Sequence, residues 1–220
     1  MTPRRGRVAV VAARPGPLGV RVADALIEAG AEVHVVAPPI DTGTARAALA
    51  AAGHPDVVVW ADVDPDALTP RSVVDLGEPD WARRSEDPVR SLLWLLQAAH
   101  PHLRDRDGRV VLVCPSIGLE GAAGLVPLAT AAEAQRLLAK SAARRWGGDS
   151  ITVNCVTVSV TALDPALAAA APDAARTAPA LGAPDALDGA AAAVAWLACG
   201  TASAITGATI GADGGAVMAP

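Results

Sequence analysis

The sequence predicts an α/β protein built on a doubly wound, parallel β-sheet. Short runs of β-branched residues alternate with longer Ala- and Leu-rich stretches of helical period, which is typical of consecutive βαβ units. The length of 220 residues suits one domain of this class and is short for two. Residues 1–220 are therefore expected to form a single domain.

Three strands and two helices are expected in the first part of the chain. A strand at 7–13 leads through a Gly- and Pro-containing turn into a helix at 19–30, which ends at a glycine. The buried face of this helix is expected to carry Val20, Ala23, Leu26 and Ile27. A second strand at 31–38 and a short helix near 43–52 follow. The continuous apolar run at 56–60 predicts a buried third strand.

The rest of the chain continues the same alternation. Residues 63–80 are rich in Pro and Asp and are expected to form a loop. The elements predicted after this loop are helix 91–103, strand 109–114, helix 128–146, strand 151–159, helix 185–199 and strand 206–212. The Ala- and Pro-rich segment 161–184 is low in complexity and is predicted to be the most mobile part of the chain.

Composition argues against several functional classes. The net charge is -5 and the basic residues are scattered, so the sequence indicates no basic surface that would bind nucleic acid. Five Trp but no Phe or Tyr are present, so no platform for stacking bases is visible. The first apolar run ends after about seven residues at Arg14 and Pro15, too short for a signal peptide or membrane span. We expect a cytoplasmic protein that binds neither nucleic acid nor membranes.

Cysteines and histidines give no indication of a metal site. Cys114, Cys155 and Cys199 are odd in number and lie in apolar segments, where a free cysteine behaves as a small buried side chain. Two of the four histidines flank Pro101 at a predicted helix end, and the other two lie far apart in sequence. We expect neither a disulfide bond nor a bound metal.

Three long segments carry a resemblance to a known family. GRVVLV, LATAAEAQRLLAKSAARRWGGDSITVN and LGAPDALDGAAAAVAWLACGTASAITGATIGADGG follow one another in the order and spacing of short-chain dehydrogenase/reductases. WARRSEDPVRSLLWLLQAAHPHL is similar to the central interface helix of that family. The chain resembles the family, in particular 3-oxoacyl-acyl carrier protein reductase-like members, over nearly its whole length. The resemblance implies a Rossmann-like fold.

The stretch between the second strand and DVVVW is short for this family. One edge strand and its helix are therefore predicted to be missing. An alternative alignment makes VVVWADVDPDAL the third strand, with Asp62 as its adenine-side carboxylate, and SVVDLG a displaced fourth strand. We prefer the first alignment, because GHPDVVVW matches the family's fourth strand and leaves a loop of normal length before Trp81.

In the family, a TGxxxGxG turn lets the backbone approach the pyrophosphate of a dinucleotide. Ala13 and Pro17 stand at glycine positions of this turn, and proline supplies no N–H donor. Arg14, Gly16 and Gly19 are what remains for a cofactor, and Arg14 can offset the charge of an anion. No cofactor is therefore expected, and NAD(P) binding is not supported by the turn.

The resemblance implies an Asn, Ser, Tyr and Lys catalytic set, yet the sequence contains no tyrosine. Aligned through GGDSITVN, Leu128 takes the tyrosine position and Ala132 the lysine position, and neither side chain can move a proton. Pro88 takes the asparagine position. The serine position falls on Pro115 or, with a shift of one residue, Ser116.

A largely apolar cleft is expected at the carboxyl ends of the strands, where ligands bind in such sheets. Its candidate residues are Arg14, Asp62, Cys114, Ser116, Leu128 and Ser159. Asp62 and Asp64 can be read as an acid/base pair or as ordinary turn residues. Lys140, two helical turns past Ala132, is assigned to the helix surface.

These observations predict a catalytically degenerate protein without hydride transfer, a pseudoenzyme that acts as a non-catalytic partner of a related reductase. The first alternative is a non-redox enzyme or binding protein, such as a cyclase, dehydratase or isomerase, for a small apolar metabolite of specialised metabolism. The second is an atypical NAD(P)-dependent oxidoreductase. Helices 88–103 and 124–146 are apolar around much of their surface and are expected to build a homo-oligomer or a hetero-oligomer with a homologue.

Overall fold

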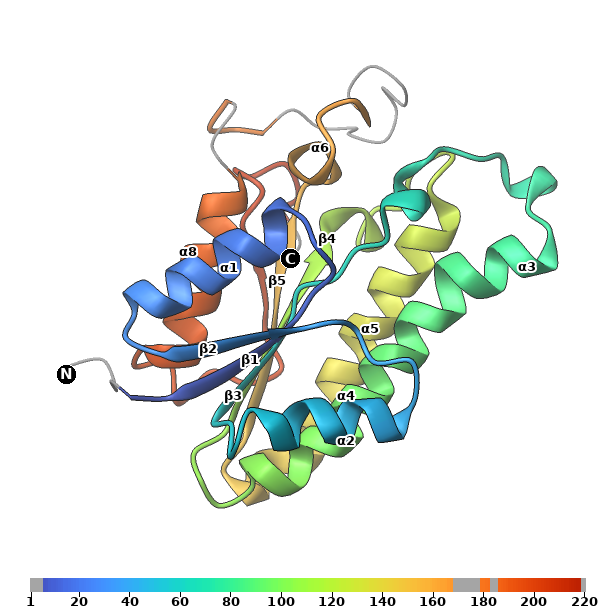
Figure 1. The fold of residues 1–220 in the computed structure, drawn as a ribbon. Helices are drawn as coiled ribbons and strands as arrows, with labels where there is room; N and C mark the ends of the chain where they lie inside the picture. The colour runs from blue at the N-terminus through green and yellow to red at the C-terminus, as the bar shows by residue number, and fades with distance from the viewer. Residues whose placement is uncertain (1–5, 168–178, 183–185, 219–220) are drawn as a thin grey trace.

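A computed structural model describes residues 6–167, 179–182 and 186–218 of the chain. Its centre is a parallel sheet of six strands (Figure 1). The strands are β1 (Val8–Ala12), β2 (Glu32–Val36), β3 (Val57–Trp60), β4 (Arg109–Pro115), β5 (Thr152–Val158) and β6 (Thr209–Gly211). Their order across the sheet is β2-β1-β3-β4-β5-β6, so the winding direction reverses between β1 and β3. The predicted fold class is confirmed.

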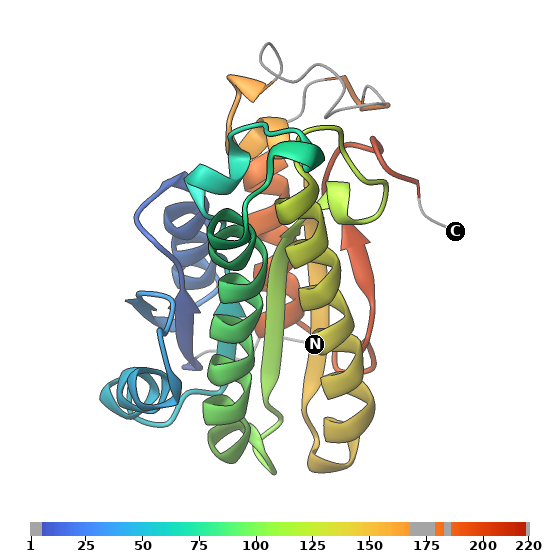
Figure 2. The same cartoon turned by 90° about the vertical axis from the view of Figure 1, so that its right-hand side faces the viewer.

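Helices cover both faces of the sheet. The long helices are α1 (Pro17–Glu28), α2 (Thr42–Ala51), α4 (Asp87–Leu103), α5 (Val126–Trp146) and α8 (Ala186–Cys199). In Figure 1, α1 and α8 pack against one face, and α2, α4 and α5 against the other. Figure 2 shows α4 and α5 running side by side. Among the described helices, none is long and apolar enough to cross a bilayer.

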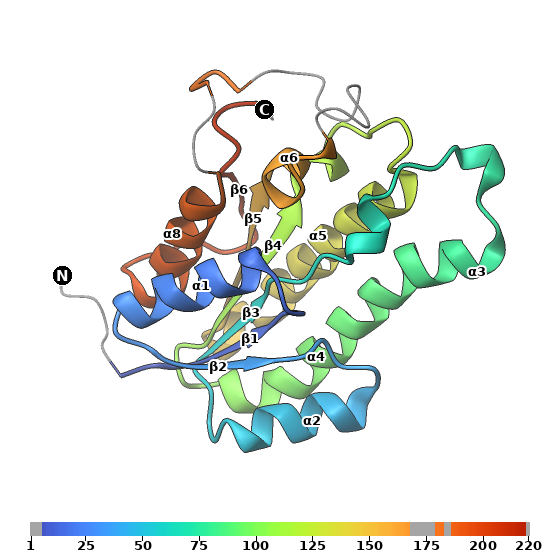
Figure 3. The same ribbon diagram turned by 45° about the horizontal axis from the view of Figure 1, so that its top comes forward.

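Shorter elements connect these layers. Those at the carboxyl edge are η1 (Pro65–Leu68), η2 (Val73–Asp75), α3 (Glu78–Trp81), η3 (Ala82–Glu86), η4 (Ser116–Gly118) and α6 (Val160–Leu163). At the amino edge, η5 (Gly147–Asp149) joins α5 to β5. The segment predicted as a loop at 63–80 thus contains two 3-10 turns and one helical turn. Figure 3 shows α6 beside the carboxyl ends of β4 and β5. Of the segment predicted to be mobile, residues 168–178 and 183–184 lie outside the described residues.

The pairing of β3 decides between the two alignments. β3 lies between β1 and β4, with Val58 opposite both Val10 and Val110, and β2 is the sheet edge. The prediction that one edge unit is missing is therefore confirmed. SVVDLG forms no strand, because its central residues adopt the 3-10 turn η2 with Val73 and Val74 exposed.

The buried face predicted for α1 needs a correction. Val20 and Ile27 are 58% and 56% exposed, whereas Leu18, Val22 and Leu26 are buried. The latter three recur every four residues and form the row that faces the sheet. The helix also begins earlier than expected, because Pro17 occupies its first position, where the fixed φ of proline suits a helix start.

Candidate functional site

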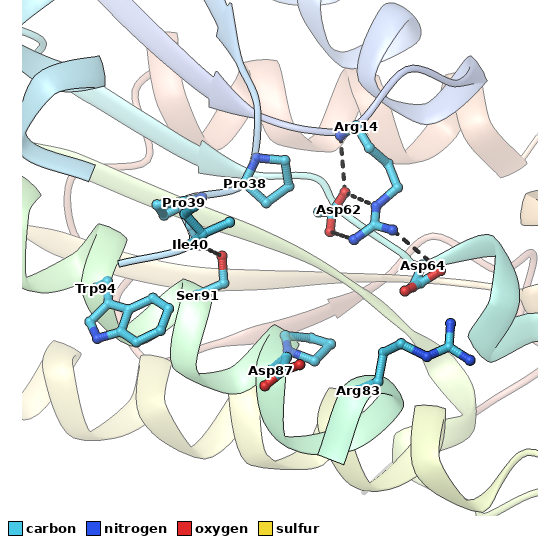
Figure 4. A pocket seen from close by; sticks show the side chains of 11 residues that line it. Arg14, Pro38, Pro39, Ile40, Asp62, Asp64, Arg83, Asp87, Ser91 and Trp94 are labelled. Carbon is cyan, nitrogen blue, oxygen red and sulfur yellow. Dashed lines mark hydrogen bonds and ion pairs between the residues drawn. The ribbon is translucent and has the colours of Figure 1, made fainter. Parts of the chain in front are cut away.

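An ion pair lies at the point where the strand order reverses. Arg14 follows β1 and Asp62 follows β3, the two strands on either side of this switch point. The guanidinium donates through Nε to Asp62 Oδ1 at 2.8 Å and through Nη2 to Asp62 Oδ2 at 3.0 Å (Figure 4). The backbone N–H of Arg14 also donates to Oδ1 at 3.0 Å. Three hydrogen bonds therefore fix Arg14 across the crevice in which ligands of such sheets bind.

A second carboxylate completes this cluster. Arg14 Nη1 lies 3.2 Å from Asp64 Oδ1, and the same carboxylate caps η1 by accepting from the backbone N–H of Asp66. The side chain of Asp62 is 2% exposed and that of Arg14 is 36% exposed. Burial lowers the pKa of Arg14, but hydrogen bonds and charge from Asp62 and Asp64 outweigh it and raise the pKa overall. The guanidinium therefore stays charged, within a cluster of formal charge -1.

Three hollows meet at Arg14. The first, about 340 Å³, lies between the loop after β2 and the start of α4 (Figure 4). Its walls include Pro38, Pro39, Ile40, Asp87, Pro88, Ser91 and Trp94. The second, about 410 Å³, lies between α1 and β2 and is lined in part by Asp24 and Val35. An elongated ligand along the carboxyl edge would therefore pass Arg14.

The third hollow, about 190 Å³, lies on the other side of the turn after β1. It is lined mainly by apolar side chains, including Leu18, Val63, Leu68 and Leu163, with Asp164 at its border. Leu68 also belongs to an apolar cluster at the carboxyl edge of the sheet, and Val63 and Leu163 pack against that cluster. Other members of this cluster include Ile117, Leu125, Leu128 and Val160. A small apolar group is therefore accommodated on this side.

The turn itself retains the features that receive a phosphate. A Cβ at Gly19 would lie 2.8 Å from the Cβ of Ala13, so only glycine allows α1 to pack this closely on β1. A Cβ at Gly16 would meet no atom within 4 Å, which leaves the backbone open to a ligand. Pro17 removes one N–H, but the N–H groups of Leu18 and Gly19 and the positive end of the α1 dipole remain. The residues present fit a dinucleotide pyrophosphate beside Arg14.

On the substrate side, Ser116 follows β4 and is buried in η4. Leu128 and Ala132 lie on α5, and both are buried. A Cβ at Gly118 would lie 3.1 Å from that of Ala132, so this part of α5 packs directly on η4. Ser116 and Leu128 therefore lie on two elements, η4 and α5, that pack against each other.

Two other candidate residues, Cys114 and Ser159, have structural roles. Cys114 points into the core beneath α5, where the neighbouring thiol of Cys155 and burial raise its pKa well above the usual value. Ser159 caps α6, since its hydroxyl accepts from the backbone N–H of Thr161. Neither residue is brought to Arg14, and a thiol of raised pKa is a poor nucleophile.

Sequence reasoning missed Gln135, Pro38 and Trp94. Gln135 is buried between helices and donates from Nε2 to the carbonyl of Pro88 at 3.3 Å. Pro38 and Trp94 line the first hollow. The Pro-Pro pair after β2 and a tryptophan in an otherwise aliphatic helix were the available signals. Within the described parts of the chain, no cluster of three or more His, Cys, Asp or Glu side chains could hold a metal ion.

A doubly wound parallel sheet with a charged turn at its switch point places the protein in the Rossmann-like class of α/β proteins. A family model described as enoyl-(acyl carrier protein) reductase matches residues 64–217. The chain belongs to the short-chain dehydrogenase/reductase family.

Individual relatives agree with this assignment. An uncharacterized short-chain type dehydrogenase/reductase of Sinorhizobium fredii is 35% identical over 91 residues, 40% of this chain and 36% of that protein. The match thus spans about a third of the relative's length. A short-chain dehydrogenase/reductase of Serratia marcescens is 26% identical, with a TM-score of 0.78 over 96% of this chain and 97% of its own. A gluconate 5-dehydrogenase of Burkholderia cenocepacia, solved with NADP and tartrate, shares the fold, with a TM-score of 0.82, 21% identity and coverage of 99% and 97%.

Two predictions are thereby wrong: that the protein is a pseudoenzyme without hydride transfer, and that it has no NAD(P) cofactor. The matching model is that of a reductase, the relatives are dehydrogenase/reductases, and a dehydrogenase of the same fold holds NADP. The prediction gave too much weight to the replaced glycines. Proline at the first position of α1 removes one donor, whereas Gly19, the helix N-terminus and the hollows beside Arg14 are retained.

Proposed function

We propose that this protein is an NAD(P)-dependent oxidoreductase that reduces or oxidises a small, largely apolar substrate. The observation that carries the proposal is the Arg14–Asp62 pair, which spans the switch point where three hollows meet. Family membership supports it independently. A nicotinamide dinucleotide would supply the hydride donor or acceptor.

The arrangement suggests how this chain would hold such a cofactor. Arg14, Gly16 and Gly19 would bind the diphosphate at the N-terminus of α1. The hollow with Pro38 and Trp94 suits the adenine end, and the smaller apolar hollow on the opposite side of the turn suits the nicotinamide end. The guanidinium then lies between the two, where the charge of the ligand is concentrated.

Ser116 is proposed to orient the substrate oxygen. Its hydroxyl can donate to a carbonyl and stabilise negative charge that develops there, an effect worth roughly 10²-fold to 10³-fold in rate for one donor. We propose that Leu128 and Ala132 replace the family's tyrosine and lysine, so that the proton comes from water instead. Reduction of a double bond conjugated to a carbonyl is compatible with this, because the proton is then added to carbon after hydride transfer.

We also propose that the protein forms a homodimer through the helices 88–103 and 124–146. Leu93 and Leu137 are 38% and 52% exposed, and Trp94 and Leu138 are only partly covered. Exposed apolar side chains on two neighbouring helices suit a two-fold interface. The three cysteines are unpaired, which suits a reducing compartment such as the cytoplasm.

The test is calorimetric titration of the purified protein with NADH and NADPH, followed by an assay of nicotinamide absorbance with a panel of enoyl thioesters and ketones. Saturable binding of one nucleotide and substrate-dependent turnover are expected. Absence of binding to both nucleotides would overturn the proposal. Sedimentation analysis in the same buffer tests the dimer, and a monomer at all concentrations would exclude it.

A further inference from the structure

A further hollow lies between α5 and the edge strand β6. Figure 2 shows how these two elements run at this side of the sheet. Its volume is about 430 Å³. It is lined by residues of α5, β5 and β6, by the chain that follows β6 and by the residue after η4. Among them are Leu119, Arg136, Lys140, Thr157, Thr209 and Asp213. It shares no lining residue with the three hollows at Arg14.

Two hydroxyl groups beside this hollow have no hydrogen-bond partner among the described residues. Thr157 on β5 is 2% exposed, and its hydroxyl makes no hydrogen bond to any part of the chain that the structure describes. The hydroxyl of Thr209 on β6 is buried and likewise unpaired among these residues. Cys155 pairs with Thr209, and Thr157 lies two residues further on, so both hydroxyls point to the same face of the sheet. A hydroxyl without a hydrogen bond is unfavourable, so a ligand that reaches the hydroxyl of Thr157 gains a hydrogen bond.

A glycine keeps the space beside Thr157 open. Gly211 pairs with Thr157 in the sheet. A methyl group added there would lie 3.6 Å from Asp213 Oδ1 and 3.9 Å from Thr157 Oγ1. Both oxygen atoms therefore border the volume that a side chain at this position would fill.

Among the residues that the structure describes, one positive and one negative charge of the walls have no counter-ion. Arg136 and Lys140 are one turn apart on α5, but Arg136 is held by a two-point ion pair with Glu133. Lys140 has no carboxylate partner among the described residues. Asp213 is buried and accepts from the backbone N–H groups of Gly215 and Val217, at 3.1 and 3.2 Å, without a cation beside it.

We propose that this hollow binds a small monocarboxylic acid that carries hydroxyl groups. The carboxylate would pair with Lys140, and the hydroxyl groups would bond to Thr157 and the remaining lone pairs of Asp213. A second carboxylate on the ligand would face Asp213 and be repelled. The volume falls in the range of small-molecule sites.

The experiment uses the full chain without nucleotide, so that its outcome is independent of the proposed oxidoreductase activity. D-glycerate is titrated by calorimetry, with propionate as the matched acid without hydroxyl groups and glycerol as the matched polyol without charge. Lys140 is the only lysine in the sequence, so acetylation followed by mass spectrometry reports on it directly. Glycerate should bind saturably, protect Lys140 from acetylation, and bind at least about tenfold more tightly than either control. Equal affinity for propionate, or no protection, would overturn the proposal.

Variants separate a binding role from a structural one. Thr157→Val removes an unpaired hydroxyl at constant shape, and should weaken glycerate binding without lowering the melting temperature. Gly211→Ala should weaken glycerate binding by narrowing the hollow beside Thr157 and Asp213, and should leave the fold intact because the added methyl group makes only ordinary contacts. Arg144→Gln, an exposed change one turn beyond Lys140, is the matched control and should bind as the parent does. Loss of folding stability in Thr157→Val would show that the hydroxyl is structural, and would contradict the proposal.

Discussion

Replacing Asp64 with asparagine should tighten nucleotide binding, although it removes an ion-pair partner of Arg14. Asp62 holds Arg14 with three hydrogen bonds, so the guanidinium stays in place. Asparagine also keeps the oxygen that caps η1. The substitution removes one negative charge that lies 3.2 Å from Arg14 Nη1. Arg14 is the cation that is proposed to bind the diphosphate.

The size of the effect follows from Coulomb's law. A phosphate on the other side of the guanidinium would lie roughly 6 Å from Asp64, where like charges repel by about 0.7 kcal/mol in water and about 3 kcal/mol at an effective dielectric constant of about 20. Asp64 is 15% exposed, which favours an intermediate value. A gain of about 1 kcal/mol corresponds to roughly fivefold tighter binding.

The assay is calorimetric titration of NADH and NADPH into the parent, Asp64→Asn and Asp75→Asn. Asp75 is an exposed carboxylate on η2 and serves as the matched change of charge. The difference between parent and Asp64→Asn should shrink as salt is added, because partly exposed charges are screened. If Asp64→Asn binds nucleotide no better than Asp75→Asn, Arg14 does not bind the diphosphate and the reasoning fails.

Three further changes test other parts of the site and fold. Ser116→Ala should lower kcat roughly 10²-fold while leaving nucleotide affinity unchanged, because one donor to the substrate oxygen is lost; kinetics and calorimetry separate the two. Gly19→Ala should destabilise the protein by about 1–3 kcal/mol in denaturant unfolding, because its Cβ would lie 2.8 Å from that of Ala13. Burial and the charge of His54 lower the pKa of His102 from 6.5, so the unfolded chain takes up this proton first and stability falls as the pH drops through about 6.5. His102→Gln should reduce that loss, measured by unfolding at several pH values.

Each of these three predictions would be contradicted by a specific result. A Ser141→Ala variant, changed at an exposed serine of α5, must keep full activity, and equal losses in both serine variants would remove Ser116 from its role. Gly19→Ala of parental stability would mean that the approach of α1 to Ala13 is not tight. An identical dependence of stability on pH in the parent and His102→Gln would show that His102 does not titrate differently on folding.

The sequence was sufficient to predict the sheet because its central strands β1, β3 and β4 contain continuous apolar runs. Val57, Val58 and Val59 are all buried, and such a run has no solvent face that could shift its register. The orientation of α1 was not predictable in the same way. Val20 and Ile27 are apolar yet exposed, and periodicity cannot distinguish an apolar residue that faces the sheet from one beside an edge.

The sequence predicted individual residues of the site, but not which of them contact one another. Arg14 and Asp62 were both candidates, but they are 48 positions apart, and their pairing depends on β1 and β3 being neighbours. The same holds for the role of the turn. The replaced glycines of the turn predicted that no cofactor binds. The close approach of Gly19 to Ala13 and the open space at Gly16 become visible only in the three-dimensional structure.

The loss of an edge unit explains the shape of the first hollow. With β2 at the sheet edge, no further strand can form a wall beyond Val35, which is more than half exposed. The chain leaves β2 through Pro38 and Pro39 and enters α2, which packs against α4. The hydroxyl of Ser91 on α4 donates to the carbonyl of Pro39 at 2.5 Å and fixes this crossing (Figure 4). Helix α4 therefore supplies a wall for the hollow at the shortened edge, and a compact nucleotide-sized space persists beside Arg14 without the missing strand.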